Sequence, residues 1–169
     1  LSSSDRRLRD YTSKAMVEVL KNNFELCEVT LKKFQDVNDP YILQRLYGVV
    51  FGAYCKCTEF QENVIVSLVK YVYDTIFEKE FVYPDILLRD YARMILEKFL
   101  DSHPNYSSTF THEKITPPYK SQPIVPVTDD YVEMECSGGL WHIQSSMRFE
   151  GLGMYGDFGR YVFQSALRY

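Results

Sequence analysis

Apolar residues recur at spacings of three and four along most of this chain, which is the period of an amphipathic α-helix. In chain order, this pattern predicts helices at 5–22, 24–35, 40–56, 59–77 and 84–100. The apolar stripe of the last of these helices is formed by Leu88, Ala92, Ile95 and Phe99. The first part of the chain is therefore expected to be helical, with short polar turns between the helices.

An aspartate followed by an arginine marks the start of several predicted helices. The pairs are Asp5 and Arg9, Asp39 and Arg45, Asp85 and Arg89, and Asp157 and Arg160. An aspartate at this position accepts hydrogen bonds from the free amides of the first turn, and a proline such as Pro40 fits the first helical position. The intervals between the first three arginines suit a two-helix repeat, and the longer interval before Arg160 suits a repeat that carries an insertion.

Prolines change the character of the chain after residue 100. The stretch 101–128 contains Pro104, Pro117, Pro118, Pro123 and Pro126. Because proline lacks an amide donor and clashes with the preceding turn, no regular helix is expected to run through this stretch. We therefore expect helical repeats at 1–100, an irregular Pro-rich insertion at 101–140 and a final partial repeat at 141–169.

Two short apolar segments near the C-terminus have the character of strands. Residues 131–135 and 140–147 flank Ser137-Gly138-Gly139, a sequence typical of a tight turn. We predict a small β-hairpin here, followed by a helix over 158–168. The predicted fold is thus an all-α helical repeat, or α-solenoid, that carries a Pro-rich insertion and this hairpin.

Net charge and cysteine content indicate the class of ligand and the cellular compartment to expect. The chain carries 19 Lys and Arg against 23 Asp and Glu, a net charge of −4. A mildly acidic chain is a poor general binder of nucleic acid, because the phosphates require a basic surface. No apolar run reaches the roughly 18 residues that a membrane helix needs, and the cysteine content does not suggest a disulfide scaffold. These features indicate a cytoplasmic protein that acts neither on membranes nor on nucleic acid.

The sequence contains no group of residues that points strongly to catalysis. The phosphate-loop pattern Gly-x-x-x-x-Gly-Lys-Ser/Thr is absent. Cys55 and Cys57 lie two residues apart in a predicted helix, so they point in different directions and are expected in the core rather than on a metal. Cys136 and His142 supply a nucleophile and a base, but nothing in the sequence orients the base. We therefore predict no catalytic, metal-binding or cofactor-binding residue in this segment and expect it not to be an enzyme.

The repeated aspartates and arginines admit two interpretations. In stacked helix pairs, such residues hydrogen-bond along the stack and satisfy backbone groups at the helix ends. We favour this structural ladder, whose expected members are Asp39, Arg45, Asp85, Arg89, Asp157 and Arg160. The alternative is that Arg45 or Arg89 grips an acidic group of a partner.

The pairing of an aspartate and an arginine resembles HEAT-like repeats, whose second helices carry both residues. The spacing from Asp39 to Arg45 matches those repeats best. The shorter spacing from Asp5 to Arg9, repeated near residue 85, departs from it. The resemblance implies stacked helix pairs with a long concave binding surface.

Four segments carry a narrower resemblance. They are Arg9-Asp10-Tyr11-Thr12-Ser13-Lys14-Ala15, Val37-Asn38-Asp39-Pro40-Tyr41 with Arg45-Leu46-Tyr47-Gly48, Leu88-Arg89-Asp90-Tyr91-Ala92-Arg93, and Asp157-Phe158-Gly159-Arg160-Tyr161-Val162. In this order they resemble the helical region of large bacterial antiviral ATPases of the STAND type, in particular the AVAST (Avs) class. Those proteins join an effector, a nucleotide-switch ATPase and a helical-repeat sensor that binds a phage protein. The resemblance covers the helical part alone, so it implies neither ATP hydrolysis nor effector chemistry here.

The resemblance implies a sensor or scaffold segment that binds protein. Because the chain begins without Met, we expect it to be a fragment of a larger protein. Its partner would be a phage protein or another module of the parent chain, and the candidate contacts are Tyr119, Trp141 and His142. Two alternatives remain open: a structural spacer that joins modules of the same protein, and a small enzyme whose site lies within 141–160.

Overall fold

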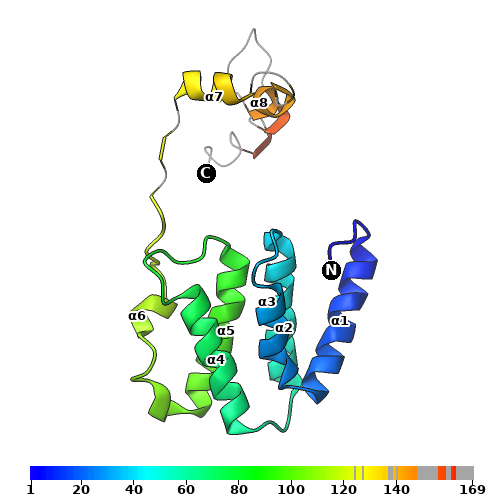
Figure 1. Cartoon of the computed structure of the whole chain (residues 1–169), viewed down its shortest axis with the longest axis vertical. Helices are drawn as coiled ribbons and strands as arrows, with labels where there is room; N and C mark the ends of the chain where they lie inside the picture. The colour runs from blue at the N-terminus through cyan, green and yellow to red at the C-terminus, as the bar shows by residue number, and fades with distance from the viewer. Residues whose placement is uncertain are drawn as a thin grey trace. The chain divides into compact units, whose positions relative to one another are not determined.

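The computed structural model describes residues 1–123, 125–126, 128–136, 139, 141–147, 156–158 and 161–162. The chain divides into two compact units, Leu1–Gln122 and Pro123–Tyr169. Regular structure in the described residues is helical throughout, so the all-α prediction is confirmed (Figure 1). None of the described helices has the length and apolar character needed to cross a membrane.

Five longer helices form most of the first unit. They are α1 (Arg6–Asn22), α2 (Leu26–Phe34), α3 (Pro40–Lys56), α4 (Glu62–Ile76) and α5 (Ile86–Ser102). All five lie where the hydrophobic period predicts them. The bounds of α3 agree with the predicted range, whereas α2 and α4 begin a few residues later than predicted. The pattern therefore identifies each helix more reliably than it identifies the first turn.

Aspartates begin the three longest helices of this unit, each of 17 residues. The Oδ1 atoms of Asp5, Asp39 and Asp85 each accept a hydrogen bond from a first-turn amide, at 2.8, 3.0 and 2.8 Å. Pro40 takes the first helical position of α3. These side chains satisfy amides that have no partner inside the helix, which explains why each helix begins at this residue.

The central helix of the first unit is α3. It packs against both α1 and α5, whereas α2 and α4 pack on each other and against α3 and α5 respectively (Figure 1). Arg45 near the start of α3 bonds to Ser13 in the middle of α1, and Lys56 at the end of α3 bonds to Glu18 farther along α1. The two helices therefore run in the same direction.

The buried core of this unit draws on every one of its longer helices. The stripe predicted for α4 is buried throughout and consists of Ile65, Leu68, Val69, Val72 and Ile76. Tyr54 and Phe99 are the largest fully buried side chains of α3 and α5. Burial of these apolar surfaces is the main term that holds the helices together.

The Pro-rich stretch after α5 packs against this core as far as Tyr119. It contains the one-turn helices η1 (Pro104–Tyr106) and α6 (His112–Ile115). Phe110 is buried with its ring 5.0 Å from that of Tyr73, and the Val82 amide bonds to the Lys120 carbonyl at 3.0 Å. The Pro117–Pro118 peptide bond is cis. The prolines thus shape an irregular segment that covers α4 and α5.

The prediction of a β-hairpin is wrong, because the second unit is helical at the described residues of both predicted strands. Residues 129–136 form the helix α7 (Asp129–Cys136), and residues 141–147 form the helix α8 (Trp141–Met147). The Tyr131 amide bonds to the Thr128 hydroxyl at 3.2 Å, so Thr128 caps α7, and two aspartates in its first turn favour a helix start. Of the helix predicted at 158–168, the structure describes only Phe158, Tyr161 and Val162, so most of that prediction lies outside the described residues.

Candidate functional site

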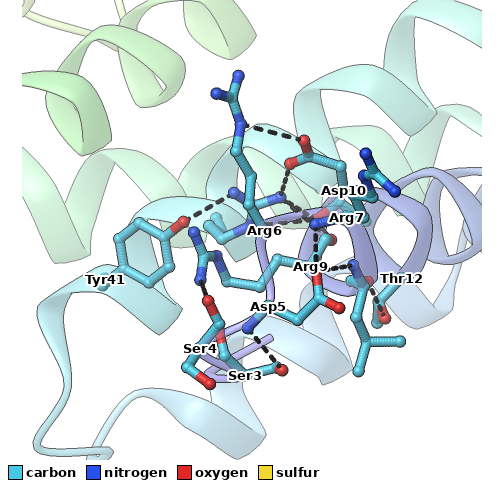
Figure 2. A network of polar contacts seen from close by, with 12 residues as sticks. Ser3, Ser4, Asp5, Arg6, Arg7, Arg9, Asp10, Thr12 and Tyr41 are labelled. Atoms are coloured by element: carbon cyan, nitrogen blue, oxygen red, sulfur yellow. Dashed lines mark hydrogen bonds and ion pairs between the residues drawn. The ribbon is translucent and has the colours of Figure 1, made fainter.

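Arg9 and Arg89 hold the same position in α1 and α5, one turn after the capping aspartate. Arg9 Nη1 donates to the carbonyl oxygens of Ser3 and Ser4, at 2.6 and 3.0 Å (Figure 2). Arg89 Nη1 donates to the equivalent carbonyls before α5, at 2.8 and 3.3 Å. In both residues the buried Nε has no hydrogen-bond partner. The two arginines therefore tie the incoming loop to the first turn of their own helix.

Arg45 has a different role, because it reaches from α3 to α1. Its Nη2 donates to the Asp10 carboxylate at 3.0 Å and to the Ser13 hydroxyl at 2.8 Å. The same nitrogen donates to the Arg9 carbonyl at 3.1 Å, and Nη1 donates to the Tyr41 hydroxyl at 2.9 Å. One guanidinium thus links α3 to three acceptors on α1, whereas its fourth acceptor, Tyr41, lies on α3 itself.

The predicted ladder residues separate into two groups. Asp39 and Asp85 cap their own helices, and Arg89 bonds to the loop before its own helix. Arg45 bonds to a neighbouring helix, as a ladder requires. Asp157 is helical in the second unit, and Arg160 lies outside the described residues. In the first unit, the side chains of the predicted aspartates therefore form no ion pair with the side chains of the predicted arginines.

Asp10 and Ser13 are the partners of Arg45 that the sequence argument missed. Asp10 directly follows Arg9 in the sequence, as Asp90 follows Arg89. This repetition was the available signal, since it marks a position shared by α1 and α5. The hydrogen bond from Arg45 lowers the pKa of the Asp10 carboxyl, so the pair is charged at neutral pH.

Tyr41 lies between two guanidinium groups at the start of α3. The Arg9 and Arg45 guanidinium carbons are each 5.5 Å from the centre of its ring. Partial burial alone would raise the pKa of Tyr41, but hydrogen bonds and charge from Arg45 and Arg9 outweigh burial and lower it. The two guanidinium groups therefore favour the ionised form of the Tyr41 hydroxyl.

A groove of about 410 Å³ begins at this point and follows α3 between α1 and α5. Its lining residues are Ser13, Lys14, Val17, Tyr41, Gln44, Arg45, Gly48, Val49, Gly52, Lys56 and Tyr91. A Cβ at Gly48 would lie 3.1 Å from the Tyr91 ring, and a Cβ at Gly52 would lie 3.1 Å from Val17. The two glycines thus allow α1 and α5 to approach α3 closely, and they leave its backbone as the floor of the groove.

The charged residues that line the groove are all basic: Lys14, Arg45 and Lys56. Arg45 is paired with Asp10, and Lys56 bonds to Glu18 at 2.8 Å. Glu18 also pairs with Lys21. Hydrogen bonds from Lys21 and Lys56 lower the pKa of Glu18 to about 2. Lys14 has no ion-pair partner within the described part of the chain, so it is the groove cation available to a ligand.

A second candidate surface is an exposed apolar stripe on α1. Leu8, Tyr11 and Val19 are 54%, 70% and 56% exposed. The residues at the corresponding places in α5 are covered: Leu88 and Phe99 are buried in the core, and Tyr91 packs against α3. The same helix face is therefore buried in α5 and open in α1.

The predicted partner-binding residues lie elsewhere. Tyr119 packs inside the first unit, with the Arg89 guanidinium 4.9 Å from its ring centre and its hydroxyl bonded to the Ile115 carbonyl at 3.2 Å. Trp141 and His142 are exposed neighbours on α8, with ring centres 3.7 Å apart. The structure does not bring these three side chains together into one site within either unit, and their role in partner binding stays a prediction.

The cysteines and histidines form no metal site within the described ranges, where no group of three His, Cys, Asp or Glu is placed to hold an ion. Burial raises the pKa of the Cys27 thiol to about 12. Cys55 is exposed, so its predicted core position is wrong. It falls on the side of α3 opposite the buried residues Val50 and Ala53. Of the enzyme site considered at 141–160, the structure describes only 141–147 and 156–158.

Comparison of the chain with protein-family models, with curated proteins and with solved structures gives no match. The groove and the α1 stripe are therefore the features of the described residues that bear on function.

Proposed function

We propose that the unit Leu1–Gln122 is a protein-binding helical repeat, a sensor or scaffold segment of a bacterial antiviral STAND-type ATPase. The parent protein would act in the cytoplasm, and its partner would be a phage protein. In this proposal the segment binds protein and holds no cofactor of its own. Nucleotide hydrolysis and effector chemistry would belong to other modules of the parent chain.

The repeated architecture supports this proposal. Three helices of equal length begin with a capping aspartate, and the middle one packs against the other two. The helices α2 and α4 alternate with them along the chain. This arrangement is compatible with HEAT-like stacking, in which each helix pair contacts its neighbours and the stack presents an extended surface to a partner.

The open stripe on α1 is the observation that carries the proposal. Leu8, Tyr11 and Val19 lie on one face of the helix and are more than half exposed. Contiguous exposed apolar residues commonly mark interaction sites, and tyrosine is enriched in protein interfaces. The corresponding face of α5 is buried against other helices. The α1 stripe has a similar apolar character, which suits it to being covered by another protein.

The test is a binding assay with purified phage structural and packaging proteins. The chain is mixed with each protein in turn and run on a sizing column with light scattering. A complex of defined mass is the expected result. If the chain is folded and helical but elutes alone with every protein, the sensor role is refuted and the structural spacer becomes the better account.

Two equally exposed valines allow a test of whether the α1 stripe is the binding surface. Val19 on α1 and Val29 on α2 are both 56% exposed. We expect Val19→Glu to abolish the complex and Val29→Glu to leave it intact, since a buried unpaired carboxylate is costly at an interface. Equal loss of binding in the two variants would contradict the assignment of the surface.

A further inference from the structure

The groove along α3 has a floor that a bound chain can approach closely. Gly48 and Gly52 have no side chains, so the helix backbone forms the floor between Val17 of α1 and Tyr91 of α5. Val17 and Tyr91 provide apolar walls. A volume of about 410 Å³ lies within the size range of specific binding sites and accommodates a few side chains.

The charges of the groove select the chemistry of its ligand. Lys14, Arg45 and Lys56 line it, and no carboxylate does. The Asp10 and Glu18 carboxylates hold Arg45 and Lys56 in place, and Lys14 remains unpaired. Complementary charge therefore requires an acidic group in the ligand, with Lys14 as its first contact.

We propose that this groove binds a short peptide segment that carries Asp or Glu side chains. A carboxylate of the segment pairs with Lys14, and an apolar side chain packs against Val17 and Tyr91 where they line the groove beside Gly48 and Gly52. This proposal gives the chemistry of a partner for the protein-binding role, and to that extent it rests on the proposed function. It concerns a surface different from the α1 stripe.

Nucleic acid is the less suitable ligand for the same cations. The chain has a net charge of −4, and two of the three groove cations already have carboxylate partners. Binding to a phosphate backbone depends on several unpaired basic residues along a continuous path. The apolar walls and the glycine floor suit a peptide side chain better than a ribose-phosphate strand.

The test uses a short synthetic peptide of Glu, Leu and Gly, and the same peptide with every Glu replaced by Gln. Binding is followed by NMR on the chain labelled with isotopic glycine. We expect the Glu peptide to shift the amide signals of Gly48 and Gly52 in a saturable manner and to leave those of Gly139 and Gly156 unchanged. The Gln peptide should produce no such shift.

Charge reversal then locates the carboxylate. Lys14→Glu should weaken binding of the Glu peptide by about tenfold or more. Lys70→Glu, at an exposed lysine of α4 outside the groove, is the matched control and should not weaken it. If circular dichroism shows that Lys14→Glu impairs folding, Lys14→Gln is used in its place. This variant should also weaken binding of the Glu peptide.

Two results would overturn the proposal. One is a Glu peptide that leaves the Gly48 and Gly52 amides unchanged. The other is an equal loss of binding in the Lys14 and Lys70 variants, which would indicate attraction to net charge alone. Because the peptides are tested without a phage protein, their failure removes only the groove assignment, whereas failure of every co-elution experiment removes the proposed function.

Discussion

Arg45 of α3 donates a hydrogen bond to the carboxylate of Asp10 on α1 at 3.0 Å. Only 20% of the Arg45 side chain is exposed, whereas 46% of the Asp10 side chain is exposed. The pair therefore lies at the edge of the interface, with the guanidinium on its inner side. Arg45 also bonds to Ser13 and to the Arg9 carbonyl of α1, so it ties the start of α3 to α1.

Replacement of Arg45 should loosen this contact. We expect Arg45→Ala to lower the free energy of unfolding by about 2 kcal/mol, because its acceptors at the helix interface lose a charged donor. Arg45→Lys should lose about half as much, since an ammonium cannot reproduce the fork of the guanidinium. Urea unfolding measures both. Arg7→Ala, at an exposed residue of α1, is the control, and an Arg45→Ala variant as stable as this control would contradict the account.

The capping aspartates predict a second effect on stability. Asp39→Ala should cost about 1 kcal/mol, because the amides of Tyr41 and Ile42 lose their acceptor. Asp39→Asn should retain most of the stability, since the amide oxygen also accepts these bonds. Thermal unfolding followed by circular dichroism at 222 nm distinguishes the variants. Asp74→Ala, at an exposed position inside α4, should behave like the wild type, and a cost equal to that of Asp39→Ala would count against a capping effect.

Arg89 allows the structural role to be separated from partner binding. It bonds to the carbonyls of Tyr83 and Pro84, and Tyr119 covers its guanidinium. We expect Arg89→Ala to lower the free energy of unfolding by about 1 kcal/mol and to leave the affinity for a co-eluting phage protein unchanged at low temperature. A variant of normal stability that loses binding would instead give Arg89 a direct contact with the partner.

The lowered pKa of Glu18 predicts how the stability of the fold changes at acidic pH. Lys21 and Lys56 lower its pKa from the usual value near 4.5 to about 2 in the folded chain. The unfolded chain therefore takes up the proton first as the pH falls, so the stabilisation from Glu18 is complete above pH 4.5 and is lost between about 4.5 and 2. The difference in melting temperature between the wild type and Glu18→Gln should shrink over this interval. Glu62→Gln provides the control, and a difference that does not change with pH would refute the linkage.

Sequence signals that act within a few residues predicted the helices of the first unit but not the contacts between these helices. The bounds of α3 follow from Asp39, Pro40 and the apolar period, all of which act within a few residues. The partners of Arg45 lie on another helix, so their identity depends on how α1 and α3 pack. The groove was missed for a related reason, because Gly48 and Gly52 form a floor only when Val17 and Tyr91 stand on either side.

The prediction of a β-hairpin was wrong because the two segments on which it rested were short. A few apolar residues with a glycine turn fit either a strand or a helix, and the Thr128 hydroxyl caps the first turn of α7. Cys55 was misplaced because it was assigned by residue type, whereas the buried residues Val50 and Ala53 define which face of α3 points inward. Tertiary packing thus supplied what the sequence pattern left undetermined.

Hydroxyl-radical footprinting of the chain with a co-eluting phage protein tests the central claim most directly. The claim is that the open face of α1 binds protein. Tyr11 is 70% exposed in the free chain, and Tyr131 of α7 is 50% exposed. The account predicts that complex formation protects Leu8 and Tyr11 from oxidation and leaves Tyr131 unchanged. A stable complex in which Tyr11 is oxidised as rapidly as in the free chain would contradict it.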